Sequence, residues 1–335
     1  MKFLVGLVLL SYTLVAGAQV IMQPSIKSHL AAESLLLDIT NVKDEFMIAV
    51  GERGHIVRST NAKDWQQVDV PTRSTLTAVT FADERHGWAV GHDALILHTQ
   101  DAGLTWEVQQ YLPETQKPLL DVSFKNNKEG VAVGAYGMFF RTEDGGKNWT
   151  QEYHISLLPQ EDIDYLQELM KEDEAAYLDE RSSILPHFNR IYIDGRTSYL
   201  AGEFGLLAKS QDFGKTWVRF EEIYSGSFYD ISRTQAGNLI AVGLRGNVFR
   251  SLTNGTPWQH IQTKSTALLN NILLVDEKHI LLFGNNGVML RSDDDGKSFT
   301  ALLQEDGKAL MAACVYRGEV VVASEVGIKV MQVKL

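Results

Sequence analysis

Acidic, histidine and thiol side chains are the first candidates for chemistry in this sequence. Glycoside hydrolysis needs two carboxyl groups at a fixed separation. Two of the three residues Glu52, Asp93 and Glu203 could form such a pair if the fold brought them together. His92 precedes Asp93, but one histidine and one acid on a turn do not make a set of metal ligands. The single cysteine, Cys314, lies in an apolar run, where a thiol is more often a core residue than a nucleophile. We therefore expect no catalytic residue, metal site or cofactor.

The charge and the first residues indicate the compartment. The 31 basic and 42 acidic residues give a net charge of −11, which argues against a nucleic-acid partner because nucleic acid needs a basic face. Lys2, the apolar run 3–15 and the small residues Ala16-Gly17-Ala18 predict a signal peptide over residues 1–18. The run is shorter than the ~20 residues that span a bilayer. We expect residues 19–335 to be a periplasmic or secreted monomer without a membrane span.

A tripeptide that usually ends in glycine recurs along the chain and divides it into units. The seven copies are Ala49-Val50-Gly51, Ala89-Val90-Gly91, Ala132-Val133-Gly134, Leu200-Ala201-Gly202, Ala241-Val242-Gly243, Leu282-Phe283-Gly284 and Val322-Ala323-Ser324. Their last residues are 40, 43, 68, 41, 41 and 40 positions apart. The long interval equals one ordinary repeat plus an insertion of about 27 residues.

Each unit has the pattern of four short strands, which in the second unit cover 75–81, 87–91, 95–99 and 106–110. A unit of ~40 to 45 residues with four strands is typical of a propeller blade, which cannot bury both faces without neighbours. The sequence therefore predicts an all-β, seven-bladed propeller of four-stranded blades. The predicted blades are near 35–70, 75–112, 118–154, 187–222, 227–263, 267–303 and 308–335.

The last unit shows only three strands, so one strand of its sheet must come from elsewhere. The segment Val20 to Ile26 precedes the first blade, and we predict that it fills this place, because pairing first with last removes two open edges. Pro24 limits the pairing, since proline donates no backbone hydrogen bond.

Polar turns connect the third and fourth strands of most units. The full form runs from Ser210 to Trp217, with near copies at 99–106, 142–149 and 292–299 and degenerate ones at 59–65 and 251–258. We expect the aspartate to accept from backbone N–H groups two residues on, the glycine to adopt a positive φ, and the aromatic residue to pack between blades. The predicted structural residues are Asp101, Asp144, Asp212, Asp294, Trp106, Trp149 and Trp217.

These turns resemble the Asp-box (BNR) repeats of sialidases and many other propellers. With the Ala-Val-Gly tripeptide and the basic residue before each box, the pattern is similar to the photosystem II stability/assembly factor family over nearly the whole mature chain. The resemblance implies a non-enzymatic assembly or accessory factor that binds proteins of an envelope membrane complex. A sialidase-like glycosidase, which by resemblance would have six blades and an arginine clamp, is one alternative. A propeller that binds a small ligand in its channel is another.

A basic residue recurs at the end of the third strand. The positions are Arg58, His98, Arg141, Lys209, Arg250 and Arg291. A residue repeated in every blade usually serves the blade, so we interpret this series as structural, with a client-binding patch as the alternative.

The turns between second and third strands, here called the BC turns, vary from blade to blade and lie on the face opposite the Asp-boxes. Variation on a constant scaffold is typical of a recognition surface. The candidate partner-binding residues there are Glu52, Arg53, His92, Asp93, Tyr136, Glu203, Phe204, Arg245, Asn285 and Asn286.

The insertion, residues 156–186, lies between blades three and four and rises from the same face. Its segment from Glu161 to Arg181 is predicted to be helical and is rich in acids. The apolar stripe at helical spacing consists of Ile163, Leu166, Leu169, Met170 and Tyr177. We expect this stripe to dock on the propeller; a partner-binding helix and a lid over the channel are the alternatives.

Overall fold

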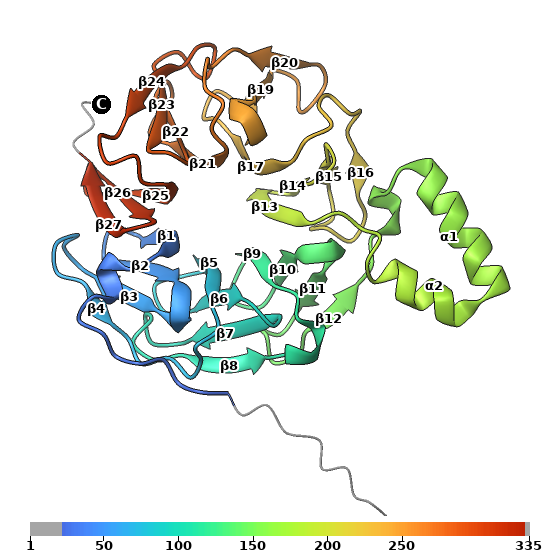
Figure 1. Ribbon diagram of the computed structural model, residues 1–335, viewed down its shortest axis with the longest axis horizontal. Coiled ribbons are helices and arrows are strands. Elements are labelled where there is room, and N and C mark those ends of the chain that lie inside the picture. Colours follow the sequence, from blue (N-terminus) through green and yellow to red (C-terminus); the bar gives the residue numbers. More distant parts are fainter. Residues whose placement is uncertain (1–21, 332–335) are drawn as a thin grey trace, which may run out of the picture.

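Seven antiparallel sheets surround a central axis in the computed structural model, which describes residues 22–331 (Figure 1). Six sheets have four strands each in chain order, and the seventh has three within the described residues. This confirms the predicted seven-bladed propeller. No helix of the described part is long and apolar enough to cross a membrane. The predicted signal peptide, residues 1–18, lies outside the described residues.

The strand bounds follow the repeat. Blade one contains β1 (Leu36–Val42), β2 (Phe46–Gly51), β3 (Ile56–Ser59) and β4 (Gln66–Gln67). Blade two contains β5 (Leu76–Phe81), β6 (Gly87–Gly91), β7 (Leu95–Thr99) and β8 (Glu107–Gln110). Blade three contains β9 (Leu119–Phe124), β10 (Gly130–Gly134), β11 (Phe139–Thr142) and β12 (Thr150–Glu152). Blade four contains β13 (Phe188–Asp194), β14 (Thr197–Gly202), β15 (Leu207–Ser210) and β16 (Val218–Arg219).

The remaining blades repeat the arrangement. Blade five contains β17 (Phe228–Arg233), β18 (Leu239–Gly243), β19 (Val248–Ser251) and β20 (Trp258–Ile261). Blade six contains β21 (Leu269–Leu274), β22 (Ile280–Gly284), β23 (Val288–Ser292) and β24 (Thr300–Leu303). Blade seven contains β25 (Leu310–Tyr316), β26 (Glu319–Ser324) and β27 (Gly327–Met331). Short 3-10 helices are η1 (Ala31–Glu33), η2 (Glu52–Gly54), η3 (Pro113–Thr115), η4 (Ala135–Gly137), η5 (Ile155–Leu157) and η6 (Leu244–Gly246).

The glycine of the recurring tripeptide lies where two strands approach closely. A Cβ on Gly134 would lie 2.3 Å from the carbonyl oxygen of Pro118, the residue before β9. The same atom on Gly202 would lie 2.4 Å from the carbonyl oxygen of His187. In all seven blades the pairing of first and second strands shifts register at this point. In six blades a glycine makes room at this bulge, and in blade seven Ser324 takes its place.

The Asp-box turns are closed by hydroxyl and carboxylate groups together. In blade three the Thr142 hydroxyl donates to Asp144 Oδ1 (2.9 Å) and accepts from the Gly146 N–H (2.8 Å). Asp144 Oδ1 also accepts from the Asn148 N–H at 3.0 Å. The aspartate therefore accepts from the backbone N–H four residues later in the chain. The prediction that it would bond an N–H two residues later was wrong. The boxes at 99–105, 210–216 and 292–298 repeat this pattern.

Aromatic side chains at the ends of these turns fill the space between blades. Trp106 of blade two is buried in one cluster with Phe46 of blade one and Leu95 of its own blade. Its ring meets that of Phe81 edge to face, at 6.2 Å between centroids. The Asp-box thus positions an aromatic residue that joins adjacent sheets.

The N-terminal segment lies elsewhere than predicted. Residues 20 and 21 are outside the described part, and residues 22–26 do not join the seventh sheet. Instead the Ser25 N–H donates to the Val70 carbonyl (2.9 Å), and Arg73 Nε donates to the Pro24 carbonyl (2.9 Å). The physical reason is that these polar bonds hold the segment beside blade one, while Pro24 lacks the N–H that a strand of the seventh sheet would use.

Blades one and seven meet through direct contacts. β1 packs against β25, and η1 packs against β27. The Asn41 side chain donates to the Val315 carbonyl at 2.7 Å, and the Tyr316 hydroxyl donates to the Thr60 carbonyl at 2.5 Å. These contacts close the ring without the predicted strand.

The insertion forms a helical hairpin of α1 (Gln160–Glu172) and α2 (Glu174–Arg181), where one helix was predicted. Asp173 interrupts the helix with extended backbone angles, and its carboxylate accepts from the Ala176 N–H at 3.0 Å as the cap of α2. Figure 1 shows the hairpin projecting outward beyond β12 and β16, away from the channel. The lid alternative is therefore wrong.

The apolar stripe of the hairpin docks on the propeller. Leu166 and Tyr177 are buried in a cluster with residues of blades three and four, including Phe139 and Phe188. Ile163 and Leu169 are partly buried against the same cluster. Met170 is the exception, since 56% of its surface is exposed.

Candidate protein-binding face

The BC turns form a ring whose backbone is held in one way seven times. In every blade the N–H of the first turn residue donates to the carbonyl of the residue directly before the first strand. In blade three this bond joins the Ala135 N–H to Pro118 (3.0 Å), and in blade four it joins the Glu203 N–H to His187 (3.1 Å). Variable side chains are therefore carried on a constant backbone.

The second residue of most BC turns has a left-handed backbone. The positive φ angles belong to Arg53, Asp93, Tyr136, Phe204, Arg245 and Asn286. A left-handed conformation costs a residue with a side chain roughly 1–2 kcal/mol, and the hydrogen bonds of the turn hold it in place. Phe204 (φ 52°) is 69% exposed as a residue, and Tyr136 (φ 53°) is 45% exposed. The scaffold thus presents two large aromatic side chains to solvent.

The carboxylates proposed for hydrolysis each bind locally. Glu52 Oε1 accepts from the Leu35 N–H (3.4 Å), and Asp93 Oδ2 accepts from the Ser74 hydroxyl (3.0 Å). Glu203 Oε2 accepts from the His187 N–H at 3.2 Å. Each bond stays within one blade and serves to hold its own turn, so the contacts give no support for a catalytic pair. Of the remaining predicted turn residues, four are exposed: Arg53, His92, Arg245 and Asn286. Asn285 Oδ1 accepts from the Asn270 side chain at 3.1 Å.

Two basic residues connect the ends of the insertion to the aromatic turns. Lys117 Nζ donates to the Ser182 carbonyl (2.8 Å) and lies 5.0 Å from the Tyr136 ring centroid. Arg219 donates from Nη1 to the Leu157 carbonyl and from Nη2 to the Phe204 carbonyl, both at 3.1 Å. The insertion and the BC turns of blades three and four therefore form one surface. We call Tyr136, Phe204 and residues 155–186 the hairpin surface.

The central channel contains a set of charged residues that sequence reasoning missed. Asp38, Asp121 and Asp230 occupy the same position of the first strand in blades one, three and five. One carboxylate oxygen of each accepts a 2.8 Å hydrogen bond from a backbone N–H of the next blade, from Val79, Ile191 and Ile272 respectively. In blade six Asn271 Oδ1 accepts in the same way from Ala313, at 3.1 Å. These side chains act as clasps between blades around a cavity of about 260 Å³.

Arg190 of blade four is the cation of this channel. Its Nη1 lies 3.4 Å from Asp121 Oδ1, and its Nε lies 3.3 Å from Asp230 Oδ1. Burial raises the pKa of Asp38 to about 6, although Arg190 acts in the opposite direction. Burial likewise raises the pKa of Asp121 and Asp230, while Arg190 and backbone N–H groups again oppose the shift. Since backbone amides already bind the carboxylates, the arrangement is suited to holding blades together.

A signal for the channel set is present in the repeat. Leu37-Asp38-Ile39, Leu120-Asp121-Val122 and Tyr229-Asp230-Ile231 place an acid between apolar residues at one repeated position. An acid inside a buried strand needs partners, so comparing this position across units would have indicated the clasps.

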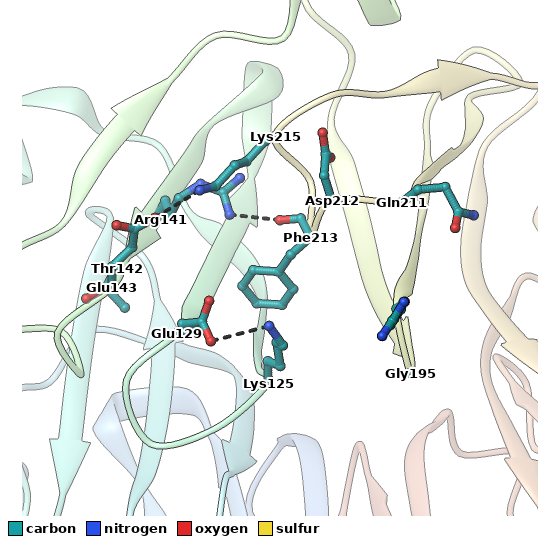
Figure 2. Close-up of a pocket in the computed structure, with 11 residues that line it drawn as sticks. Lys125, Glu129, Arg141, Thr142, Glu143, Gly195, Gln211, Asp212, Phe213 and Lys215 are labelled. Carbon is teal, nitrogen blue, oxygen red and sulfur yellow. Dashed lines mark hydrogen bonds and ion pairs between the residues drawn. The ribbon is translucent and has the colours of Figure 1, made fainter.

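The opposite face carries a groove between blades three and four, with a cavity of about 360 Å³ (Figure 2). Arg141 forms a bidentate pair with Glu152, with donor–acceptor distances of 2.6 and 3.0 Å, and donates to the Phe213 carbonyl at 2.8 Å. Arg141 and Lys125 also lie 5.7 and 5.8 Å from the centroid of the Phe213 ring. Partial burial alone would raise the pKa of Glu152, but bonds from His154 and Arg141 outweigh it and lower that pKa to about 2.

Arg58 and Arg250 of the recurring basic series donate to the next blade as Arg141 does, whereas His98 and Arg291 pair with Glu107 and Asp293 of their own blades. Arg58 Nε donates to the Ala102 carbonyl at 3.1 Å, and Arg250 Nε donates to the Asp295 carbonyl at 2.8 Å. Both acceptors, like Phe213, precede the glycine of the next Asp-box. These bonds favour the structural interpretation of the series over a client-binding patch.

Neither a thiolate nor a metal cluster is found in the described part. Cys314 is buried, and burial raises the pKa of its thiol to about 12, which keeps the thiol protonated near neutral pH. Within residues 22–331, no group of three or more His, Cys, Asp and Glu side chains could hold a metal ion.

Comparison with known proteins shows which family the sequence is similar to. A family model described as "Photosynthesis system II assembly factor YCF48" matches residues 57–163. The photosystem II assembly protein Ycf48 of Thermosynechococcus vestitus is 28% identical over 232 residues, which cover 69% of this chain and 60% of the relative. The photosystem II assembly lipoprotein Ycf48 of a Picosynechococcus strain is 31% identical over 232 residues, covering 69% of this chain and 61% of the relative. The chain therefore spans less than two thirds of the length of these relatives.

Solved structures agree in fold. A structure described as YCF48 bound to D1 peptide superposes with a TM-score of 0.67 at 16% identity, over 91% of this chain and 97% of that one. The structure of YCF48 from Cyanidioschyzon merolae superposes with a TM-score of 0.67 at 17% identity, over 89% of this chain and 95% of that one. At such identity the likeness shows the seven-bladed fold alone, while the family assignment depends on the sequence matches. In sequence, the chain is similar to the Ycf48/HCF136 family of photosystem II assembly factors.

Proposed function

We propose that this protein is an exported, non-enzymatic assembly or accessory factor that binds a segment of an envelope membrane-complex protein. Curated relatives are named as assembly proteins, and one solved relative is described as bound to a D1 peptide. Three relatives are named as lipoproteins, which supports export, as does the predicted signal peptide of this chain. The client of this chain is proposed only as a class, a membrane-complex protein.

One observation carries the location of the site: Tyr136 and Phe204 are exposed on left-handed turns, each beside a different end of the insertion. Aromatic residues are enriched among the residues that dominate binding energy in protein interfaces. Burial of an exposed Phe side chain contributes about 1.5–3 kcal/mol, and the backbone that carries each of these two rings is already held by the hydrogen bonds of its turn. Less conformational entropy is then lost on binding.

The experiment is capture of partners from the native host by chemical cross-linking to a tagged protein. The double variant Tyr136→Ser/Phe204→Ser should lose the membrane-complex partner, with a melting temperature close to that of the wild type. Leu252→Ser is the matched control, because Leu252 is 64% exposed in the degenerate Asp-box turn after β19, on the other face. Loss of the partner from the control alone would move the site to the Asp-box face. Absence of any envelope partner from the wild type would contradict the binding function itself.

A further inference from the structure

The α1–α2 hairpin carries most of the net charge of the protein. Residues 160–181 contain nine acidic and two basic side chains, a net charge of −7, while the whole chain has −11. The other residues therefore share a net charge of only −4 among them. Such a concentration of one sign gives the surface a strong negative potential.

The acids of the hairpin are free to meet a partner. Within residues 160–181, all of which the structure describes, they accept two hydrogen bonds from protein groups, from Gln160 to Asp164 (2.7 Å) and from the Ala176 N–H to Asp173 (3.0 Å). None of these acids forms an ion pair with a side chain of the described chain, in contrast to Glu152 just before the insertion. Their mutual repulsion is consequently not offset within the protein.

Exposed apolar side chains stand among these acids. Tyr165, Met170 and Leu178 are each about half exposed, although Leu166 and Tyr177 of the same helices are buried on the propeller. Met170 and Leu178 lie on either side of the break at Asp173, close to the tip of the hairpin. The bonds of Lys117 and Arg219 fix both ends of the insertion, so the surface is presented in a defined position.

We propose that the hairpin surface binds a lysine- and arginine-rich segment of the client protein that also carries apolar side chains. Its cations would offset the unpaired acids, and its apolar groups would cover Met170 and Leu178 near the tip of the hairpin and the Phe204 ring beside its first residues. The exposed fractions of these three side chains mark where the burial would take place. Opposite charges also speed the encounter of the two proteins. An anionic membrane surface, by contrast, is repelled by this charge. The inference rests on the proposed protein-binding function and names the chemistry of its partner.

The test uses three fluorescein-labelled peptides of equal length, which alternate Lys with Leu, Lys with Ser, and Glu with Leu. Fluorescence anisotropy should show that the Lys/Leu peptide binds the wild-type protein about tenfold more tightly than either control peptide, which corresponds to ~1.4 kcal/mol. The affinity should fall as salt is raised, because surface charges are screened. Vesicles that contain phosphatidylglycerol should not bind.

Variants separate charge from apolar contact. Glu168→Gln/Glu172→Gln/Glu174→Gln/Asp179→Asn should weaken Lys/Leu binding about tenfold. Met170→Ser/Leu178→Ser should weaken it several-fold at unchanged charge. The matched control neutralises four exposed acids outside the hairpin, Glu221, Glu277, Glu305 and Glu319, and should bind as the wild type does. Circular dichroism checks that the hairpin variants keep their helices.

Two results would overturn the inference. One is equal binding of the Lys/Leu peptide by the hairpin variants and the control variant. The other is vesicle binding that exceeds peptide binding. Capture of the native client distinguishes this failure from failure of the proposed function. If the hairpin variants keep the client while Tyr136→Ser/Phe204→Ser loses it, the protein-binding function stands and the basic-segment inference is wrong. If the wild type captures no client, the proposed function fails.

Discussion

Arg190 of blade four lies 3.3 Å from the carboxylate of Asp230 in blade five, inside the central channel. It also approaches Asp121 of blade three, so one guanidinium connects three successive blades at the axis. The ring is therefore held by charges as well as by apolar packing.

Removal of this cation should destabilise the protein in a pH-dependent way. Arg190→Met leaves Asp121 and Asp230 buried without their counter-charge, which should cost about 3–5 kcal/mol near neutral pH. Because an unpaired buried acid keeps its proton to higher pH, the cost should shrink as pH falls and the acids become protonated. Urea unfolding at two pH values measures the loss, and Arg196→Met, an exposed arginine two residues beyond β13, is the control. An equal loss in both variants would contradict the role of the channel pair.

Asp38 should lower stability when it is ionised. Its folded-state pKa is about 6, above the ordinary 3.8, so the folded protein holds this proton more tightly than the unfolded chain does. The cost is absent below the ordinary pKa, grows as pH rises between the two values and is complete above about 6. The free energy of unfolding of Asp38→Asn should therefore exceed that of the wild type by up to about 3 kcal/mol at pH 8 and should equal it at pH 4.

Blade six shows that asparagine fits this position, since Asn271 bonds the next blade there. Denaturant unfolding across the pH range checks the prediction. A variant that is less stable than the wild type at pH 8 would mean that the ionised carboxylate is needed for the clasp.

The Asp-box carboxylates should stabilise their turns with the opposite sign. Partial burial alone would raise the pKa of Asp212, but bonds from the Thr216 N–H and hydroxyl and from the Ser210 hydroxyl outweigh it and lower that pKa to about 2. The ionised Asp212 carboxylate therefore stabilises the folded protein fully above the ordinary pKa of 3.8, and this stabilisation is lost as pH falls through about 2. Asp212→Ala should lower the free energy of unfolding by about 1 kcal/mol near neutral pH. The effect is small because the turn is exposed. Thermal melting compares it with Gln211→Ala, its exposed neighbour, and equal melting temperatures at pH 7 would contradict the prediction.

Lys117 should anchor the far end of the insertion. Lys117→Met removes the bond to the Ser182 carbonyl and the cation above the Tyr136 ring. Amide hydrogen exchange in α2 should then become faster by roughly tenfold, the effect of about 1.4 kcal/mol, while exchange in β9 and β10 stays as before. Lys128→Met, an exposed lysine in the turn between those strands, is the control. Unchanged exchange in α2 would show that the apolar stripe alone holds the hairpin.

The repeat made the fold predictable, because Gly134 and its counterparts mark a close approach that recurs in nearly every blade. The clasps were not predicted, since the partner of Asp121 is the backbone of Ile191 in the next blade, and a single unit does not reveal such a neighbour. The missing strand of blade seven was assigned to residues 20–26 on edge pairing alone, without weighing the bonds that Ser25 makes with blade one.

The candidate site was only partly predictable for a similar reason. Variation located the BC turns, but the left-handed backbone that exposes Phe204 depends on the hydrogen bonds of the folded turn. Helical periodicity located the insertion, yet it placed Met170 in the docked stripe, where the structure leaves this side chain exposed.

The most direct test of the central claim, that the BC-turn face binds a membrane-complex protein, is photo-cross-linking in the native host. A benzophenone amino acid at position 204 should give an adduct with an envelope membrane-complex protein, and the same group at position 252, on the Asp-box face, should give none. Adducts at 252 without any at 204 would contradict the account.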